Sequence, residues 1–193
     1  MKTVIVKYNA GNIQSVLFAL ERIGIIAEVT DNAEKITSAD KVIFPGVGEA
    51  SSAMNYLKEK KLDQVLVSLK QPVLGICLGM QLMCKHSEEG NTDCLGVFNL
   101  QVEKFRGREK VPQIGWNNIY SLKENLFNGL KESEYMYFVH GYYAEIGEST
   151  AAKTNYNLEY SSALQKNNFY GVQFHPEKSA TAGQKILENF LTL

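Results

Sequence analysis

Short β-type runs alternate with helical patterns through the first 76 residues of the chain. Residues 3–6 are apolar and β-branched, and between residues 13 and 23 apolar side chains recur at helical spacing, with Gly24 where a helix C-cap would stand. Further strands are predicted at 25–29, 42–44 and 73–76, and further helices at about 50–60 and 62–69. Strands that alternate with helices indicate a parallel sheet with both faces covered, which belongs to the α/β class.

The second half of the chain has a different pattern. It is rich in Tyr and Asn, and the period-two alternation at 135–139 and 142–146 is typical of antiparallel strands or hairpins. A last strand at 169–174 is followed by a turn and a helix with one apolar face. We therefore predict a central mixed, mostly parallel sheet flanked by helices.

Charge and composition exclude several classes of protein. Lys plus Arg total 20 against 21 for Asp plus Glu, and this formal net charge of −1 argues against the basic surface used for nucleic-acid or anionic-membrane binding. No apolar stretch approaches the roughly 18 residues of a membrane span, and no signal-peptide cleavage site follows the short apolar N-terminus. Since no repeat or Gly/Pro/Ser-rich linker divides the sequence, residues 1–193 are expected to form a single domain.

The cysteines indicate a reducing compartment. Cys77, Cys84 and Cys94 are odd in number and form no CxxC pair, so the sequence predicts neither a disulfide framework nor a structural zinc site. We expect a cytoplasmic protein that uses no metal and no cofactor. Helical spacing among apolar neighbours indicates that Cys84 belongs to the core, whereas Cys94 is expected in a loop.

The segment from Gly75 to Gly79 has the form G-x-nucleophile-x-G, with Cys77 at its centre. It follows an apolar strand and opens a predicted helix at 78 to about 85, so the cysteine is expected on a tight turn above the sheet. A helix N-terminus favours the thiolate, and the next amide, that of Leu78, is positioned to donate to an oxyanion. The alternative is a small buried cysteine that only packs.

A nucleophilic thiol needs a base, and His175 is the strongest candidate. It ends the strand at 169–174, and the carboxyl ends of parallel strands share one edge of a sheet, where Cys77 is also expected. Glu177 follows after one proline and could orient the imidazole, which gives a Cys-His-Glu arrangement. Taken singly, the histidine could instead cap the next helix, and the glutamate could be a helix N-terminal acid.

The remaining candidates are weaker. His86 lies among polar residues and is expected to be a solvated helix-end side chain, whereas His140 ends the strand that begins near residue 135. The glycine-rich turn at 45–48 either ends a strand or presents a peptide N–H to an oxyanion. It has neither a phosphate-loop lysine nor a complete G-x-G-x-x-G, so a phosphate site is not favoured.

Two segments, 75–81 and 173–179, resemble the signature blocks of the class I, triad-type glutamine amidotransferases. The resemblance covers essentially the whole chain and implies a flavodoxin-like α/β domain that hydrolyses glutamine and passes ammonia to a synthase. Other segments are similar to the glutaminase subunits of imidazole glycerol phosphate synthases, the block at 113–117 being the most specific. These further segments are 8–12, 45–48, 112–117 and 137–143.

The resemblance also implies roles for individual residues. Cys77 corresponds to the nucleophile, His175 to the base and Glu177 to its orienter. The oxyanion site would be formed by Gly46, Val47, Gly48 and Leu78. The glutamine-binding residues would be Gln81, Glu89, His140, Gly141 and Tyr142. The residues facing a partner would be Asn12, Trp116 and Lys178. Gly141 departs from the family, which usually has a small hydroxyl residue there, although backbone binding of the substrate carboxylate would survive.

The implied substrate is L-glutamine, and the implied partner is a (β/α)8-barrel cyclase that forms a heterodimer with the chain and uses the ammonia in histidine biosynthesis. We further hypothesise that the Val47 N–H points away from the oxyanion until a loaded partner docks. Three alternatives remain. The chain could supply ammonia to another synthase, such as one that amidates a surface sugar; it could be a cysteine peptidase or amidase of similar fold; or it could be a non-catalytic binding module.

Overall fold

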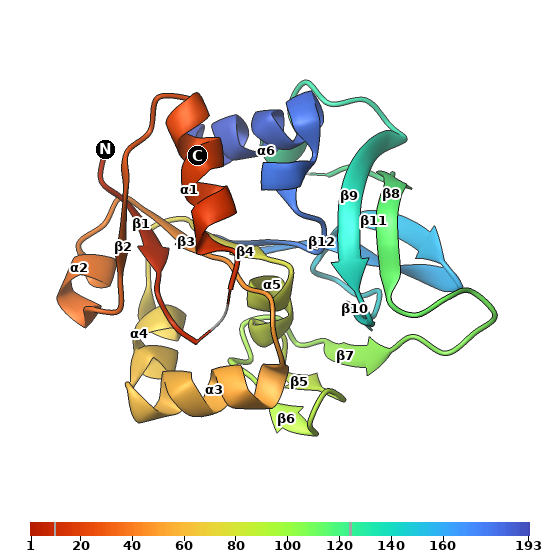
Figure 1. The fold of residues 1–193 in the computed structure, drawn as a ribbon, viewed down its shortest axis with the longest axis horizontal. Coiled ribbons are helices and arrows are strands. Elements are labelled where there is room, and N and C mark those ends of the chain that lie inside the picture. The colour runs from red at the N-terminus through yellow and green to blue at the C-terminus, as the bar shows by residue number, and fades with distance from the viewer. Residues whose placement is uncertain (10, 124) are drawn as a thin grey trace.

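A computed structural model describes residues 1–9, 11–123 and 125–193. Its main sheet begins with five parallel strands in the order β2-β1-β3-β4-β13 (Figure 1). These strands are β1 (Thr3–Val6), β2 (Ala27–Thr30), β3 (Lys41–Phe44), β4 (Val73–Ile76) and β13 (Phe169–Val172). The last strand of the chain thus lies beside β4, which brings the C-terminal segment next to the middle of the sequence.

The sheet continues beyond β13 in mostly antiparallel pairings, in the order β12-β10-β7-β5-β6, with β11 paired to β12. These strands are β5 (His86–Ser87), β6 (Thr92–Asp93), β7 (Gln101–Lys104), β10 (Tyr142–Ala144), β11 (Thr150–Tyr156) and β12 (Leu158–Lys166). A separate two-stranded sheet consists of β8 (Gln113–Ile119) and β9 (Glu134–His140). A single bridge from Tyr120 to Lys153 connects its end to β11.

Helices cover both faces of the parallel strands (Figure 1). Val4 and Val6 of β1 pack in one apolar cluster with residues of α3, α4 and α5, whereas Ile5 points to the other face and packs with residues of α1 and α6. The helices are α1 (Ile13–Arg22), α2 (Ala33–Thr37), α3 (Ala50–Glu59), α4 (Leu62–Ser68), α5 (Leu78–Leu82) and α6 (Ala180–Thr192), with 3-10 turns η1 (Asn125–Phe127) and η2 (Pro176–Lys178).

The predicted fold class is confirmed, because the sheet is mixed and flanked by helices. The strand predicted at 142–146 ends at Ala144, and the helix predicted to reach about residue 85 ends at Leu82. The prediction for His86 is wrong: it lies in β5, where its Nδ1 is 3.0 Å from Asp93 Oδ1 of β6. The chain turns back directly after α5, so this histidine pairs in a short hairpin instead of ending a helix.

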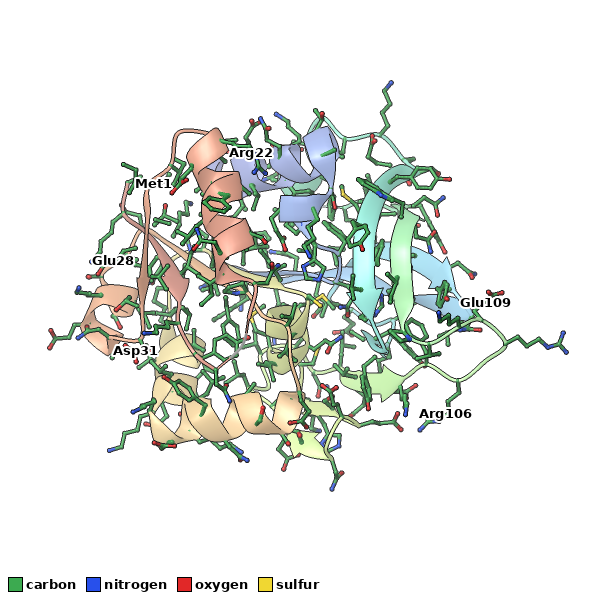
Figure 2. The ribbon with its side chains drawn as sticks, in the orientation of Figure 1. Met1, Arg22, Glu28, Asp31, Arg106 and Glu109 are labelled. Atoms are coloured by element: carbon green, nitrogen blue, oxygen red, sulfur yellow. The ribbon has the colours of Figure 1, made fainter. Side chains whose placement is uncertain are left out.

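Charged side chains of both signs project from the rim of the molecule (Figure 2). Glu28 and Asp31 lie near α2, and Arg106 and Glu109 lie at the opposite end, along the connection from β7 to β8. Arg106 pairs with Glu88 at 3.0 Å. Within the three described segments, no helix is long and apolar enough to cross a membrane.

Candidate active site

Cys77 occupies the turn between β4 and α5 with an unusual backbone conformation. Its φ of 52° and ψ of −109° are disfavoured for a residue with a side chain. Gly79 follows because a Cβ there would lie 1.8 Å from the carbonyl oxygen of Phe44. A Cβ on Gly75 would similarly lie 2.8 Å from the backbone nitrogen of Met80. The two glycines therefore let α5 pack against the ends of β3 and β4, while the turn holds Cys77 at the sheet edge.

His175 and Glu177 reach the same edge from the neighbouring strand β13. Ile76 pairs with Val172 in the parallel register, so the residues after both strands emerge together. His175 Nδ1 lies 2.8 Å from Glu177 Oε1, and both side chains are buried. Burial lowers the pKa of His175, but its interactions with Cys77 and Glu177 outweigh burial and raise this pKa to about 10. The structure thus brings together the three residues of the predicted Cys-His-Glu arrangement.

Asn12 makes a contact that the sequence did not predict. It precedes α1 in a left-handed conformation, with a φ of 72°, and its side chain makes no capping hydrogen bond to that helix. Instead its Nδ2 donates to Glu177 Oε1 across 165 positions of sequence. Asn12 therefore contacts Glu177, the carboxylate that orients His175, and also lies in a segment expected to face a partner. Ala10, in the same segment, lies outside the described residues.

Three hydrogen bonds fix the glycine-rich turn after β3. The Tyr8 hydroxyl donates to the Pro45 carbonyl at 2.6 Å, and the Gly11 amide donates to the Val47 carbonyl at 3.1 Å. The Leu78 amide donates to the Gly46 carbonyl at 3.3 Å. The amide that we expected to be open for an oxyanion is therefore occupied. Because the carbonyl and N–H of a trans peptide point in opposite directions, the Val47 N–H points away from Leu78.

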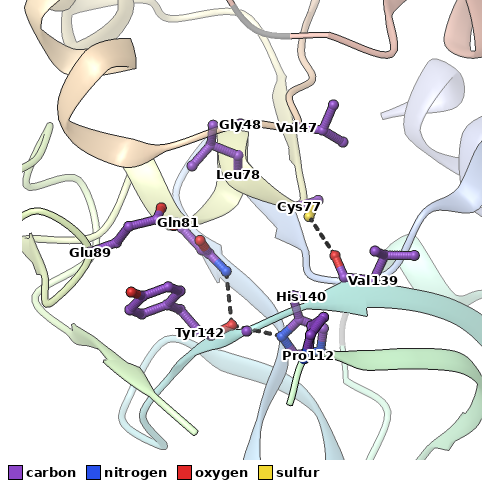
Figure 3. Close-up of a pocket in the computed structure, with 11 residues that line it drawn as sticks. Val47, Gly48, Cys77, Leu78, Gln81, Glu89, Pro112, Val139, His140 and Tyr142 are labelled. Carbon is purple, nitrogen blue, oxygen red and sulfur yellow. Dashed lines mark hydrogen bonds between the residues drawn. The ribbon is translucent and has the colours of Figure 1, made fainter.

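A pocket of about 260 Å³ opens beside Cys77 (Figure 3). It is lined by both candidate oxyanion elements and by every residue expected to bind glutamine. The lining residues are Val47, Gly48, Cys77, Leu78, Gln81, Glu89, Pro112, Val139, His140, Gly141 and Tyr142. Gly46 is buried and is not among them, and its carbonyl accepts from the Leu78 amide. This volume lies just below the usual range of ligand pockets, about 300–1,000 Å³, and is sufficient for one amino acid.

Polar side chains of the pocket are held by specific hydrogen bonds. Gln81 Nε2 donates to the Tyr142 carbonyl at 3.0 Å, and the same carbonyl lies 2.7 Å from His140 Nδ1 (Figure 3). Burial lowers the pKa of His140 to about 4, so its imidazole is neutral at pH 7. Glu89 accepts the Ala50 amide at 2.9 Å, and burial raises the pKa of its carboxyl. Glu89 supplies the pocket with an acidic group that could pair with an ammonium.

The outer face of β8 and β9 carries an exposed aromatic cluster near the site. Trp116 is 53% exposed, and its ring centroid lies 6.0 Å from that of Tyr137 in an edge-on arrangement. Lys178 is exposed, and its Nζ lies 6.0 Å from the centroid of Tyr137. Two more exposed apolar side chains, Ile114 and Tyr135, belong to the same two strands. Large exposed apolar patches rimmed by polar groups mark interaction surfaces.

The other two cysteines lack the features of Cys77. Cys84 is fully buried, in agreement with the prediction, and burial raises the pKa of its thiol. Burial also raises the pKa of Cys94, which directly follows β6, to about 12. Neither forms a reactive thiolate at neutral pH. Across residues 1–9, 11–123 and 125–193, no three His, Cys, Asp or Glu side chains group as metal ligands.

Comparison with known proteins agrees with this geometry. The family model of Glutamine amidotransferase class-I matches residues 4–193. Imidazole glycerol phosphate synthase subunit HisH of Bacteroides fragilis is 57% identical over 196 residues, which cover 100% of both chains. The protein of the same name from Shewanella loihica is 45% identical over 202 residues, which cover 99% of this chain and 90% of that one.

Solved structures support the fold independently of these sequences. A glutamine amidotransferase superposes with a TM-score of 0.72 at 21% identity, over 98% of this chain and 97% of its own. A glutamine amidotransferase from Thermotoga maritima superposes with a TM-score of 0.66 at 17% identity, over 100% of this chain and 83% of its own. The expected amidotransferase fold is confirmed. The chain belongs to the class I glutamine amidotransferases, within the family of imidazole glycerol phosphate synthase subunit HisH.

Proposed function

We propose that this chain is the glutaminase subunit of an imidazole glycerol phosphate synthase and hydrolyses L-glutamine to L-glutamate and ammonia. The observation that carries the proposal is the convergence of Cys77, His175 and Glu177 beside a pocket sized for one amino acid. The names of the relatives, which cover the full chain, support the same assignment. The low exposure and strained turn of Cys77 also agree with a nucleophile held in one orientation.

The reaction begins when His175 Nε2 takes the thiol proton and the Cys77 sulfur attacks the side-chain amide carbon of glutamine. The tetrahedral intermediate collapses as the imidazolium returns this proton to the nitrogen, and ammonia leaves. Water, deprotonated by the same imidazole, then adds to the γ-glutamyl thioester, and glutamate departs as the sulfur recovers a proton. Glu177 holds the imidazole tautomer through its 2.8 Å hydrogen bond and offsets the charge of the imidazolium.

Substrate binding follows from the polar groups of the pocket. Glu89 pairs with the α-ammonium of glutamine, and backbone groups at Gly141 and Tyr142 bind its α-carboxylate. A Cβ on Gly141 would meet nothing closer than Val111 Cγ1 at 3.7 Å, so the glycine leaves room for the small hydroxyl residue that is usual there. The departure from the family pattern is compatible with substrate binding.

The chain by itself is held in a poorly active state. The Leu78 amide is bound to the Gly46 carbonyl, and the Val47 N–H of the same Gly46–Val47 peptide points away from it, so this turn offers the oxyanion an acceptor where donors are needed. Rotation of that one peptide would free Leu78 and present Val47. Since one oxyanion donor contributes about 100- to 1,000-fold in rate, this rotation suffices to switch glutamine hydrolysis on.

The partner is a (β/α)8-barrel cyclase that receives the ammonia. It docks on the exposed face of β8 and β9, where Trp116 lies and where Lys178 of η2 reaches over Tyr137, and it extends to Asn12. The segment of Asn12 also contacts the glycine-rich turn through Gly11, which donates to the Val47 carbonyl. Docking at this segment therefore acts on the oxyanion turn and on the carboxylate of Glu177 together.

Glutamine hydrolysis by the purified chain tests the proposal in three states: alone, with a cyclase subunit, and with cyclase plus its acceptor ligand. We expect little turnover alone and at least a 100-fold increase in the third state, with ammonia incorporated into the cyclase product. Equal rates in all three states would refute the coupling. Turnover of peptides but not of free glutamine would refute the glutaminase assignment, and turnover without any cyclase product would indicate another synthase as partner.

A further inference from the structure

Gln173 contacts the sulfur of Cys77, and no step above uses it. Its side chain is fully buried, and its Nε2 lies 3.6 Å from Cys77 Sγ. It follows β13 directly, two residues before His175, and its backbone amide is fixed by a 2.9 Å hydrogen bond to the Ser162 carbonyl. It is the first residue of the signature-like segment 173–179, in which the family resemblance implies roles only for His175, Glu177 and Lys178.

A neighbouring side chain fixes which end of the Gln173 amide faces the sulfur. Gln81 Nε2 donates to Gln173 Oε1 at 2.9 Å, and Gln81 is itself anchored because the same Nε2 donates to the Tyr142 carbonyl at 3.0 Å. An amide whose oxygen accepts from one side must present its NH₂ group to the other. The hydrogen bonds that link Tyr142, Gln81, Gln173 and Cys77 therefore have a fixed direction, and the Gln173 NH₂ group donates to the sulfur.

Other donors close to the sulfur are already engaged. The Cys77 amide donates to the Val172 carbonyl at 2.8 Å, and the Leu78 amide donates to Gly46. The thiol itself lies 3.7 Å from the Val139 carbonyl, which can accept the S–H but cannot stabilise a thiolate. Once the proton has moved to His175, the thiolate faces the imidazolium on one side, and the Gln173 side chain is in position to supply a further donor.

We propose that Gln173 is a catalytic residue that donates a hydrogen bond to the Cys77 thiolate and holds it ready for attack. This inference rests on the proposed function, since it assumes that Cys77 is the nucleophile. It also gives Gln81 a role besides lining the pocket, because Gln81 positions Gln173. A hydrogen bond to a charged group changes an equilibrium by about 10- to 100-fold, so Gln173 has a measurable effect on the fraction of thiolate.

The effect of Gln173 on the fraction of thiolate can be measured beside the other titratable groups near Cys77. The imidazole of His175 faces the sulfur, with Glu177 behind it, and the phenols of Tyr8 and Tyr160 lie within its electrostatic range. Burial raises the pKa of both phenols above its ordinary value, so both phenols are neutral at neutral and mildly alkaline pH. In the described part of the chain, the Gln173 side chain is hydrogen-bonded to Gln81 and Cys77 and to none of these groups.

The rate of Cys77 alkylation by iodoacetamide against pH tests the inference, with the modified cysteine identified by peptide mass spectrometry. Gln173→Met removes the donor at similar volume, and Gln173→Glu keeps an acceptor for Gln81 while facing the sulfur with an oxygen. We expect the midpoint of the pH profile to move up by about one to two pH units in Gln173→Met, and at least as far in Gln173→Glu. Asn189→Leu is the matched control, because Asn189 is a buried amide on α6 with two hydrogen bonds away from the site.

The outcomes separate this inference from the proposed function. If wild-type Cys77 reacts no faster than Cys94, then Cys77 is no activated nucleophile and the proposed function fails. If wild-type Cys77 is reactive and the midpoint in both Gln173 variants matches that of Asn189→Leu, the role of Gln173 is refuted. Thermal melts accompany each variant, and if Gln173→Met does not fold, Gln173→Glu decides by the same criterion.

Discussion

The backbone of Cys77 stores strain that a pair of substitutions can measure. A φ of 52° with a ψ of −109° is accessible to glycine but disfavoured for any residue with a Cβ. Cys77→Ala removes the sulfur and keeps the strain, whereas Cys77→Gly removes both. We therefore expect Cys77→Gly to be the more stable of the two variants, although glycine ordinarily destabilises a folded chain.

The size of the difference follows from two opposing effects. A residue held in such a region costs about 1–3 kcal/mol, which glycine relieves. Glycine also loses more backbone entropy on folding than alanine does, which reduces this stabilisation by about 0.5–1 kcal/mol. The net stabilisation of Cys77→Gly over Cys77→Ala is therefore between about 0 and 2.5 kcal/mol, and about 1 kcal/mol at the middle of both ranges. In a domain of this size each kcal/mol raises the melting temperature by about 2–4 °C.

Calorimetric melts of the two variants check this expectation, and both variants must be inactive on glutamine. Ala53→Gly in α3 is the control, because Ala53 is buried in an ordinary helix and its replacement should lower the melting temperature. If Cys77→Gly melts below Cys77→Ala, the turn stores no strain that glycine relieves, and the reasoning is refuted.

Three further predictions concern the pocket. Glu89→Gln should raise KM for glutamine by about 10- to 100-fold and leave kcat within about twofold, because the charged partner of the substrate ammonium is lost. Steady-state glutaminase kinetics of the complex with the cyclase measure both constants. An unchanged KM would contradict the role of Glu89 in binding the ammonium. Gly141→Ser should leave kcat/KM within about twofold and the melting temperature unchanged, since a Cβ at this position makes only ordinary van der Waals contacts. A decrease of kcat/KM by about 100-fold would show that the glycine is required. Burial lowers the pKa of His140 from 6.5 to about 4 in the folded chain, so the unfolded chain binds the proton first as the pH falls. This group should therefore reduce the free energy of unfolding by about 3 kcal/mol between pH 6.5 and 4. Urea unfolding at a series of pH values checks this, and an unchanged acid slope in His140→Gln would contradict burial of a neutral imidazole.

The parallel half of the fold could be predicted from sequence because its strands are short apolar runs between clear helical patterns. The helix α2 was not predicted, since Ile36 is its one buried residue and the Asn32 cap that begins it is a single polar position. The strand β11 was missed for another reason: its small and polar residues acquire strand geometry from pairing with β12. Such pairing is a tertiary effect that local preference does not encode.

Some features of the active site could likewise be predicted from the sequence, and others could not. Cys77 and His175 could be expected together because each ends a strand of a parallel sheet, and adjacent strands share an edge. The contact between Asn12 and Glu177 could not, because no local pattern relates side chains 165 positions apart. Nor could the sequence show that the Leu78 amide is bound to the Gly46 carbonyl, since the rotation of one peptide plane beside glycine leaves no trace in residue types.

Covalent labelling by a glutamine analogue tests the role of Cys77 most directly. A diazo-ketone in place of the side-chain amide alkylates, with loss of N₂, a nucleophile positioned to attack the amide carbon, and intact-mass and peptide analysis locate the adduct. In the chain with its cyclase partner we predict one adduct, on Cys77, suppressed by excess L-glutamine and absent in Cys77→Ala. An unlabelled Cys77, an adduct on Cys94, or labelling that glutamine does not suppress would contradict the assignment of Cys77 as the nucleophile of a glutaminase.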